Sequence, residues 1–113
     1  MNKKEQLAYL AGIIDGEGHF YVPNVKNGRG VSYPTPTLLF VQSKKNNGLL
    51  LCQWAKNNFG GSVSYQKSNN MYRWELRGKK ALELSKQIKP YLIVKQKQIK
   101  RFNYYTIHKN NKQ

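Results

Sequence analysis

A short apolar stretch that ends in two acidic residues constrains this chain more than any other feature. Residues 7–20 read LAYLAGIIDGEGHF and contain Asp15 and Glu17, two of the five acids in a sequence with a formal charge of +15. The stretch has no proline and predicts a helix that ends at Gly16, a residue type that is common just beyond the last helical turn. Carboxylates are disfavoured at the negative end of a helix and repel one another, so a divalent cation bound there would stabilise both.

Residue spacing predicts where this helix begins and which face it buries. Asn2 and Glu5 stand three residues apart, which is the spacing of a capping box at a helix start. The apolar positions recur at i, i+3 and i+7 and predict one stripe that faces the core, formed by Leu7, Leu10 and Ile14.

A second stripe on the same helix consists of the small residues Ala8, Ala11 and Gly12. A glycine inside a helix costs about 1 kcal/mol relative to alanine, so Gly12 needs a packing reason. Small side chains let two helix backbones approach closely, and Ala8 and Gly12 lie one turn apart. We therefore expect another helix against this stripe. The alternative interpretation of the whole stretch is a buried amphipathic helix that ends in a solvated acidic turn.

Length and composition restrict the class of protein. The 113 residues fit a single domain, residues 1–113. The sequence has no apolar run of about 18 residues and no signal-peptide core, which argues against a membrane-spanning or secreted protein. Cys52 is the only cysteine, which excludes an internal disulfide and a cysteine-based zinc site and favours a small core residue. Twenty Lys and Arg residues, spread over the chain and not gathered on one amphipathic helix, predict a nucleic-acid partner and no membrane partner.

After the acidic residues the pattern changes from helical to extended. Residues 19–26 and 31–43 predict two strands of a long hairpin, joined by a turn with the Asn-Gly pair at residues 27–28 as its tip. Pro34 and Pro36 have no N–H for a ladder, which predicts an edge or a bend in the second strand.

A second helix is predicted over residues 47–58, before the two glycines at residues 60–61. Its predicted buried face consists of Leu50, Leu51, Trp54 and Ala55.

The remainder of the chain predicts a second hairpin and two more helices. Residues 62–67 and 71–77 alternate in polarity on either side of a short polar turn. A helix follows over residues 79–88 and is stopped by Pro90, and a last helix is predicted from residue 95 to about residue 107. The element order is therefore αββαββα, and four strands with helices on one side define an α+β fold.

The face of this sheet that the helices leave open is rich in Ser, Thr, Gln, Arg and Tyr. Such side chains read base edges in a major groove, which is wide enough for a β-ribbon. An ordinary solvated sheet surface is the alternative, and the net charge favours DNA. For His19 a role as a base is the alternative to a DNA contact. The expected DNA contacts are His19, Tyr21, Lys26, Asn27, Arg29, Thr35, Thr37, Ser62, Ser64, Gln66, Arg73, Arg77 and Lys97.

The nine residues Leu10–Gly18, LAGIIDGEG, closely resemble the signature of the LAGLIDADG homing endonucleases. The resemblance extends to the αββαββα order, to Phe59 with the two glycines that follow it, and to residues 89–98, KPYLIVKQKQ. It implies a four-stranded antiparallel sheet that forms a DNA-binding saddle, with the helices on the other face. It also implies sequence-specific cleavage of double-stranded DNA with Mg²⁺, or another divalent cation such as Mn²⁺, and no small-molecule substrate.

The resemblance assigns roles to individual residues. The second acid of the signature, Glu17, corresponds to the metal ligand, where the family more often has Asp, and the Gly16 carbonyl would be a second oxygen. The first acid, Asp15, corresponds to a mainly structural residue at the helix end. Lys95 corresponds to the family's active-site lysine near the scissile phosphate, with Lys97 as a second candidate for that role. A solvated helix face is the alternative for Lys95. Gln42 matches a glutamine that helps to order water at the active site.

A single signature implies a homodimer that forms through the signature helix, with Ala8, Ala11, Gly12 and Asp15 at the interface. Two copies would bring two Glu17 side chains together on a long pseudo-palindromic duplex. The alternatives are a non-cleaving nucleic-acid binder of the same fold, such as an RNA maturase or a DNA-binding regulator, and a structural dimer module. Richness in Lys, Asn, Ile and Tyr is typical of an AT-rich genome. We therefore expect an intracellular protein of a mitochondrion or chloroplast, or of a bacterial or phage-infected cytoplasm.

Overall fold

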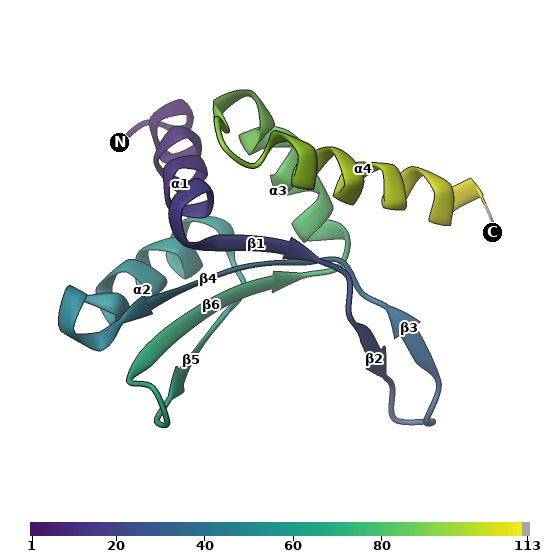
Figure 1. The fold of residues 1–113 in the computed structure, drawn as a ribbon, viewed down its shortest axis with the longest axis horizontal. Coiled ribbons are helices and arrows are strands. Elements are labelled where there is room, and N and C mark those ends of the chain that lie inside the picture. The colour runs from purple at the N-terminus through teal and green to yellow at the C-terminus, as the bar shows by residue number, and fades with distance from the viewer. Residues whose placement is uncertain (112–113) are drawn as a thin grey trace.

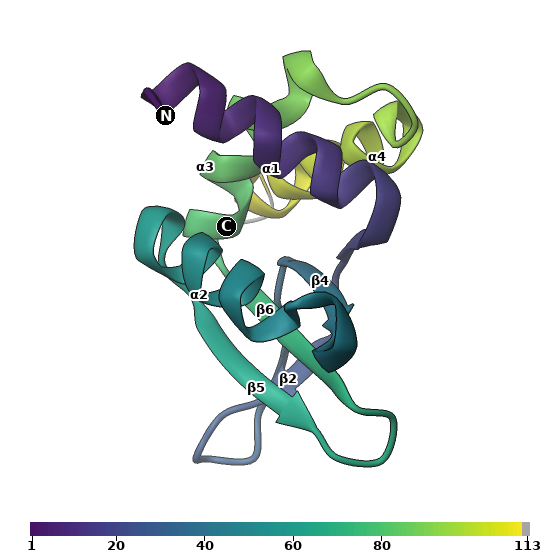
Figure 2. The same ribbon diagram turned by 90° about the vertical axis from the view of Figure 1, so that its left-hand side faces the viewer.

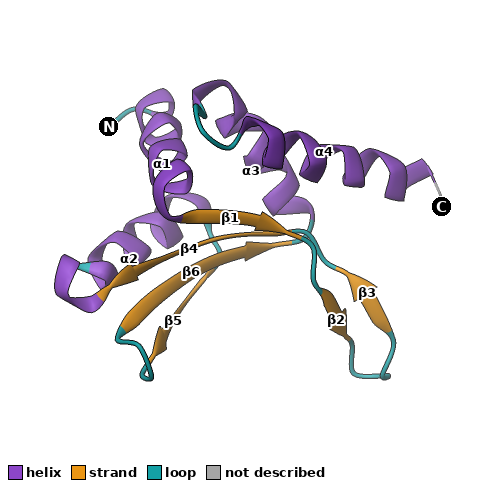
Figure 3. Cartoon of the chain, in the orientation of Figure 1, coloured by secondary structure: helices purple, strands orange, loops and turns teal. Residues whose placement is uncertain are grey.

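A four-stranded antiparallel sheet carries the α-helices on one of its faces, and its other face is open (Figure 1). The computed structural model describes residues 1–111, and side-chain surroundings through Tyr104. The sheet consists, in spatial order, of β1 (Gly18–Tyr21), β4 (Thr37–Ser43), β6 (Met71–Arg77) and β5 (Ser62–Gln66). The helices are α1 (Lys3–Glu17), α2 (Gly48–Phe59), α3 (Lys79–Ile88) and α4 (Gln96–Asn111), with 3₁₀ turns η1 (Lys44–Asn46) and η2 (Lys89–Tyr91). The predicted α+β class is confirmed, and α1, the strands of the main sheet, α2 and α3 follow the predicted αββαββα order, with two short strands and α4 in addition (Figure 3).

The strand register assigns alternate residues of the sheet to opposite faces. Phe40 of β4 lies opposite Gly18 of β1 and opposite Trp74 of β6, and Leu38 lies opposite Leu76. Because side chains alternate along a strand, these positions share the face that the helices cover. The register therefore separates the residues that build the core from those that remain accessible on the open face.

The hydrophobic core lies between this face and the helices. Phe40 and Trp74 are fully buried, with ring centroids 5.4 Å apart. The predicted core stripe of α1 is confirmed, because Leu10 and Ile14 are fully buried and Leu7 packs against the core. Helix α3 buries Ala81, Leu84, Ser85 and Ile88. The other helices contribute Cys52 and Ala55 of α2 and Ile99 and Phe102 of α4.

A separate two-stranded arm, β2 (Asn24–Lys26) and β3 (Ser32–Pro34), interrupts the first hairpin. The sequence predicted two continuous strands, whereas the structure divides each of them. Pro23 follows β1 and Pro36 precedes β4, and proline cannot donate to a ladder. At this junction the Thr35 N–H donates to the Pro23 carbonyl at 2.8 Å. The bend predicted from the prolines is confirmed, and the arm and the β5–β6 turn extend to the same side, away from α1 and α4 (Figure 2).

Helix α1 begins as predicted and ends one residue later than predicted. The Asn2 side chain accepts the Glu5 N–H at 2.9 Å, and the Glu5 carboxylate accepts the Asn2 N–H at 2.9 Å, which completes the capping box. The helix continues through Glu17, not Gly16, and β1 follows directly. A Cβ at Gly18 would lie 2.6 Å from the Ile14 Cα, so only glycine permits this immediate passage from helix to strand.

Helix α2 is rotated relative to the prediction. Its buried positions are Gly48, Cys52 and Ala55, whereas Leu50, predicted to be buried, is 69% exposed. A Cβ at Gly48 would lie 2.3 Å from the Gln42 carbonyl oxygen, so the helix begins in direct contact with the end of β4. This contact fixes which face of α2 meets the sheet and turns Leu50 outward.

The two last helices agree with the prediction in position. Helix α3 has the predicted bounds, and Pro90 lies in η2 immediately after it. Helix α4 begins at Gln96 and continues through Asn111, beyond the predicted end near residue 107. Within residues 1–111, no helix combines the length and the apolarity needed to cross a bilayer.

We expect Gly18→Ala to lower the free energy of unfolding by about 1–3 kcal/mol, because the new methyl group would overlap the backbone of Ile14. Urea or thermal unfolding followed by circular dichroism measures the loss. Gly28→Ala is the matched control, since its Cβ would meet nothing within 4 Å. Equal stability of the two variants would contradict the role given to Gly18.

Candidate nucleic-acid interface and cleavage site

The C-terminal end of α1 and the N-terminal end of α4 cap one another. The Asp15 carboxylate accepts the backbone N–H groups of Ile93 at 2.7 Å, Val94 at 3.1 Å and Lys95 at 3.0 Å. In return, the Lys95 ammonium group donates to the Asp15 carbonyl oxygen at 2.8 Å. Negative charge at the start of α4 and positive charge at the end of α1 both complement the helix macrodipoles. We call these four hydrogen bonds the α1–α4 clamp.

The clamp holds the predicted lysine at the end of the helix that carries the predicted metal-binding carboxylate. Lys95 is held at Asp15, and Glu17 lies two residues further along the same helical turn. The Glu17 side chain is exposed and has no hydrogen bond or ion pair with any other residue that the structure describes. Among the described residues, the last turn of α1 therefore carries an unpaired carboxylate at Glu17 and, anchored at Asp15, the ammonium group of Lys95.

The oxygen atoms at this helix end fit a hard divalent cation. The Asp15 carbonyl oxygen already accepts a hydrogen bond from Lys95. The oxygens of the last turn that could bind a cation are therefore those of the Glu17 carboxylate and the Gly16 carbonyl. Mg²⁺ prefers such oxygen ligands and is commonly held by one or two carboxylates. No group of three His, Cys, Asp or Glu side chains occurs among the residues described, so Glu17 is the one free carboxylate that this chain offers at this helix end.

Gln42 lies at the end of β4 on the face that the helices cover. Its Oε1 accepts the Ser43 N–H at 2.9 Å, and its side chain lines a hollow between α1 and α2. No contact in the described part of the chain joins Gln42 to Glu17 or Lys95. A role for Gln42 in ordering active-site water stays a prediction.

The stripe of small residues on α1 divides between the core and the surface. Ala11 is fully buried within the chain's own core, so its predicted place at a dimer interface is wrong; it lies on the same helix face as Leu7 and Ile14. Ala8 and Gly12 are exposed, and a Cβ at Gly12 would meet nothing within 4 Å. The packing reason expected for Gly12 is therefore not supplied within the described residues.

The open face of the main sheet collects eight of the predicted DNA contacts. The register places them together: His19, Tyr21, Thr37, Ser62, Ser64, Gln66, Arg73 and Arg77. Thr37 is the exception in accessibility, because it is fully buried at the bend and its Oγ1 donates to the Thr35 carbonyl at 3.0 Å. Tyr21 and Arg77 flank it in the register, so the prediction that Thr37 contacts DNA is wrong.

The open face also holds Glu75, an acid that sequence reasoning did not single out. Its carboxylate accepts Arg73 Nε at 3.3 Å and Arg77 Nε at 2.7 Å. Arg73 Nη2 donates in turn to the Tyr21 hydroxyl at 3.0 Å. The sequence feature that could have predicted this group is the alternation Arg-x-Glu-x-Arg, which places three charged side chains on one face of a strand.

The arm presents cations at its tip, and its asparagine has a structural task. Lys26 and Arg29 are exposed, and Thr35 is half-buried at the base. The Asn27 amide oxygen accepts the N–H groups of Arg29 at 2.8 Å and Val31 at 3.0 Å, which shapes the tip. A contact of Asn27 with DNA stays a prediction.

Two further predicted residues lie in the helical layer. Lys97 is exposed in the first turn of α4, next to the clamp. Cys52 is buried in α2, and burial raises the pKa of its thiol to about 11. The thiol therefore stays protonated near neutral pH, as expected for a core residue.

A profile of the LAGLIDADG endonuclease family matches residues 10–110, so the chain belongs to this family. The match covers α1 from the start of the signature, the sheet, and most of α4. Comparison with curated protein sequences gives no match.

Solved homing endonucleases share the fold. The structure of I-CvuI in complex with its target superposes with a TM-score of 0.75 at 20% identity, over 89% of this chain and 65% of that one. I-TnaI gives 0.72 at 25% identity, over 93% and 74%. The group I intron-encoded I-CeuI, complexed with DNA, gives 0.74 at 20% identity, over 98% and 58%. The chain thus spans less than two thirds of I-CvuI and of I-CeuI.

The two acids of α1 should differ in their effect on stability. Asp15→Asn should lower the free energy of unfolding by about 1–2 kcal/mol, because the charged acceptor of three N–H groups is lost. Glu17→Gln should leave stability unchanged or raise it slightly, since it removes a free charge from the negative helix end. Chemical unfolding of the two variants side by side tests the difference, and an equal loss would contradict the clamp.

Proposed function

We propose that this chain is a sequence-specific endonuclease that cleaves double-stranded DNA as a homodimer. The observation that carries the proposal is the arrangement at the end of α1, where Lys95 is anchored at Asp15 and the exposed Glu17 follows two residues later in the same turn. The polar open face of the sheet starts directly after this turn, at His19. A duplex bound to that face would lie close to the end of α1, where both Glu17 and Lys95 are located. Membership of the LAGLIDADG endonuclease family supports the same activity.

The surface chemistry supports a duplex partner. The open face offers hydroxyl, amide and guanidinium groups, and the arm adds Lys26 and Arg29 on the same side. Base edges in the major groove are read by such donors and acceptors, and phosphates by the cations. The open face is concave, and the arm and the β5–β6 turn project at its two ends, so a duplex could lie between them (Figure 1).

Each residue at the end of α1 has a distinct task in the proposed reaction. Water attacks the scissile phosphate in line, and no covalent intermediate forms. One donor of the Lys95 ammonium group is held by Asp15, and the other two are free to stabilise charge that builds on the phosphate. Glu17, with the Gly16 carbonyl, would hold a divalent cation, which supplies Lewis-acid stabilisation and a more acidic bound water.

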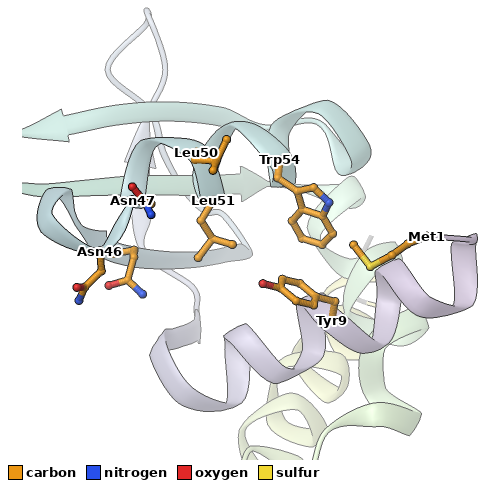
Figure 4. Close-up of a pocket in the computed structure, with 8 residues that line it drawn as sticks. Met1, Tyr9, Asn46, Asn47, Leu50, Leu51 and Trp54 are labelled. Atoms are coloured by element: carbon orange, nitrogen blue, oxygen red, sulfur yellow. The ribbon is translucent and has the colours of Figure 1, made fainter.

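The outer surface of α1 supports pairing with a second copy. Beside the exposed Gly12, Tyr9 is 52%, Ile93 86% and Val94 68% exposed. Large apolar side chains gathered at one surface are typical of an interaction site. Figure 4 shows the adjoining hollow, in which Tyr9 of α1 faces Trp54 and Leu51 of α2. The hollow has a volume of about 620 Å³. A twofold axis along α1 would cover this surface and bring two Glu17 carboxylates together.

The test of the proposed activity is Glu17→Gln. We expect the wild-type homodimer to cut one or a few sequences in a plasmid target library with Mg²⁺, and the variant to give no detectable product. Binding of the variant to the selected duplex without metal should persist, because the open face is unchanged.

Glu83→Gln is the control, because Glu83 is an exposed acid of α3 in the helical layer. This variant should cleave the duplex at the wild-type rate. Full-rate cleavage by Glu17→Gln would show that another carboxylate is required. Sequence-specific binding without any cleavage by the wild type would favour the non-cleaving alternative.

Gly12→Leu tests the pairing of α1 helices. The added side chain should separate two helices that pack on small residues and weaken the dimer by about 2 kcal/mol or more. Sedimentation velocity should then show a monomer where the wild type is a dimer. Lys86→Leu, at an exposed position of α3, should leave the dimer intact. A wild type that stays monomeric both alone and on its duplex would contradict the homodimer.

A further inference from the structure

Glu75 is an acid in the middle of a surface whose other charged groups are cationic. On the open face it lies between Arg73 and Arg77 on β6, with Leu39 of β4 and Ser62 of β5 as its neighbours across the sheet. An acid at this position repels the phosphates of a duplex laid on the face, so it weakens binding in general. If the open face binds a duplex, Glu75 must therefore contribute something other than affinity.

The carboxylate holds both arginines through the same atom of each guanidinium. Nε of Arg73 and Nε of Arg77 donate to different oxygens of Glu75, at 3.3 and 2.7 Å. Both acceptor oxygens of Glu75 thereby point at arginine, so the acid itself is engaged and does not read a base. Among the residues that the structure describes, the Nη groups of Arg77 have no partner, whereas Arg73 Nη2 donates to the Tyr21 hydroxyl at 3.0 Å.

The pairing changes where the two guanidinium groups lie. Arg73 and Arg77 are four residues apart on β6, about 13 Å along a strand, which is close to four base pairs of duplex. Both side chains bend toward Glu75, midway between them, and so converge on the same few base pairs. Their side chains are 23% and 51% exposed, with Glu75 at 16% beneath them.

We propose that Glu75 is a positioning residue for base recognition. It holds both guanidinium groups through Nε, so that among the described residues Nη1 of Arg73 and both Nη groups of Arg77 remain as donors for base edges such as guanine O6 and N7. Sequence preference at a short block of adjacent base pairs in each half-site then depends on Glu75, although Glu75 touches no base. The inference rests on the proposed function, because it assumes that the open face binds the duplex.

The experiment is a binding selection in metal-free buffer, where cleavage does not occur. The probe is a pool of duplexes with about 24 randomised base pairs, enough for two half-sites spanned by strands of this length. Wild type, Glu75→Gln and Glu83→Gln are selected in parallel. Both substitutions remove one negative charge, from the open face and from the exposed side of α3 respectively. Glu75→Thr is included as a second variant, because threonine is favoured in strands.

Glu75→Gln and Glu75→Thr should lose about tenfold in preference at one contiguous block of two to four base pairs per half-site, and keep the preference elsewhere. Their affinity for the unselected pool should rise about two- to fivefold at low salt, since an acid has left the face. Glu83→Gln should reproduce the wild-type preferences. This split between lost preference and gained affinity is not expected from damage to the fold.

Three results would overturn the inference. Preferences identical to those of the wild type would make Glu75 a solvated surface acid. A uniform loss of affinity at every position would make it a residue that only supports the fold. A wild type that selects no sequence would overturn the proposed function itself, whereas in the first two cases the proposed function stands.

Discussion

The candidate site depends on one reciprocal contact, the clamp between the end of α1 and the start of α4. Two helix ends that would each expose unsatisfied backbone groups satisfy one another, through the Asp15 carboxylate and the Lys95 ammonium group. The contact joins two residues that are 80 positions apart in a chain of 113 residues. Remove it, and Lys95 has no fixed place relative to Glu17. The two neighbouring acids of α1 thus have separate tasks, one used within the chain and one left free.

Much of the fold could be predicted from local pattern. The capping box at Asn2, the core stripe of α3 and the hairpin around residues 68–70 follow from spacing and turn chemistry, and the structure has them. The differences arise where tertiary contacts decide. Leu50 is exposed because Gly48 lets α2 begin directly on β4, which sets the rotation of the helix. Ala11 is a different case, because its spacing from Leu7 and Ile14 places it on the core face of α1, and its small size alone suggested a helix partner.

The site was predictable to the extent that it consists of sequence neighbours. Glu17 and Asp15 stand in one motif, and the resemblance supplied Lys95, but the hydrogen bonds that join them lie beyond any pattern in the sequence. For Thr37, the alternation of the strand correctly predicted the open face but not the accessibility of the side chain. Thr37 is buried because it lies at the bend that follows Pro36. The pairing of Glu75 with two arginines depends on side-chain conformation, which alternation alone does not give.

The alternation of the strands has a consequence for how such a protein can change over evolutionary time. On β6, Trp74 and Leu76 belong to the core while Arg73, Glu75 and Arg77 lie on the open face. Substitutions at the second set leave the core in place, because these side chains lie on the face that the helices do not cover. Recognition can therefore change on a scaffold that stays the same, with Arg73, Glu75 and Arg77 changing as a group because ion pairs join them.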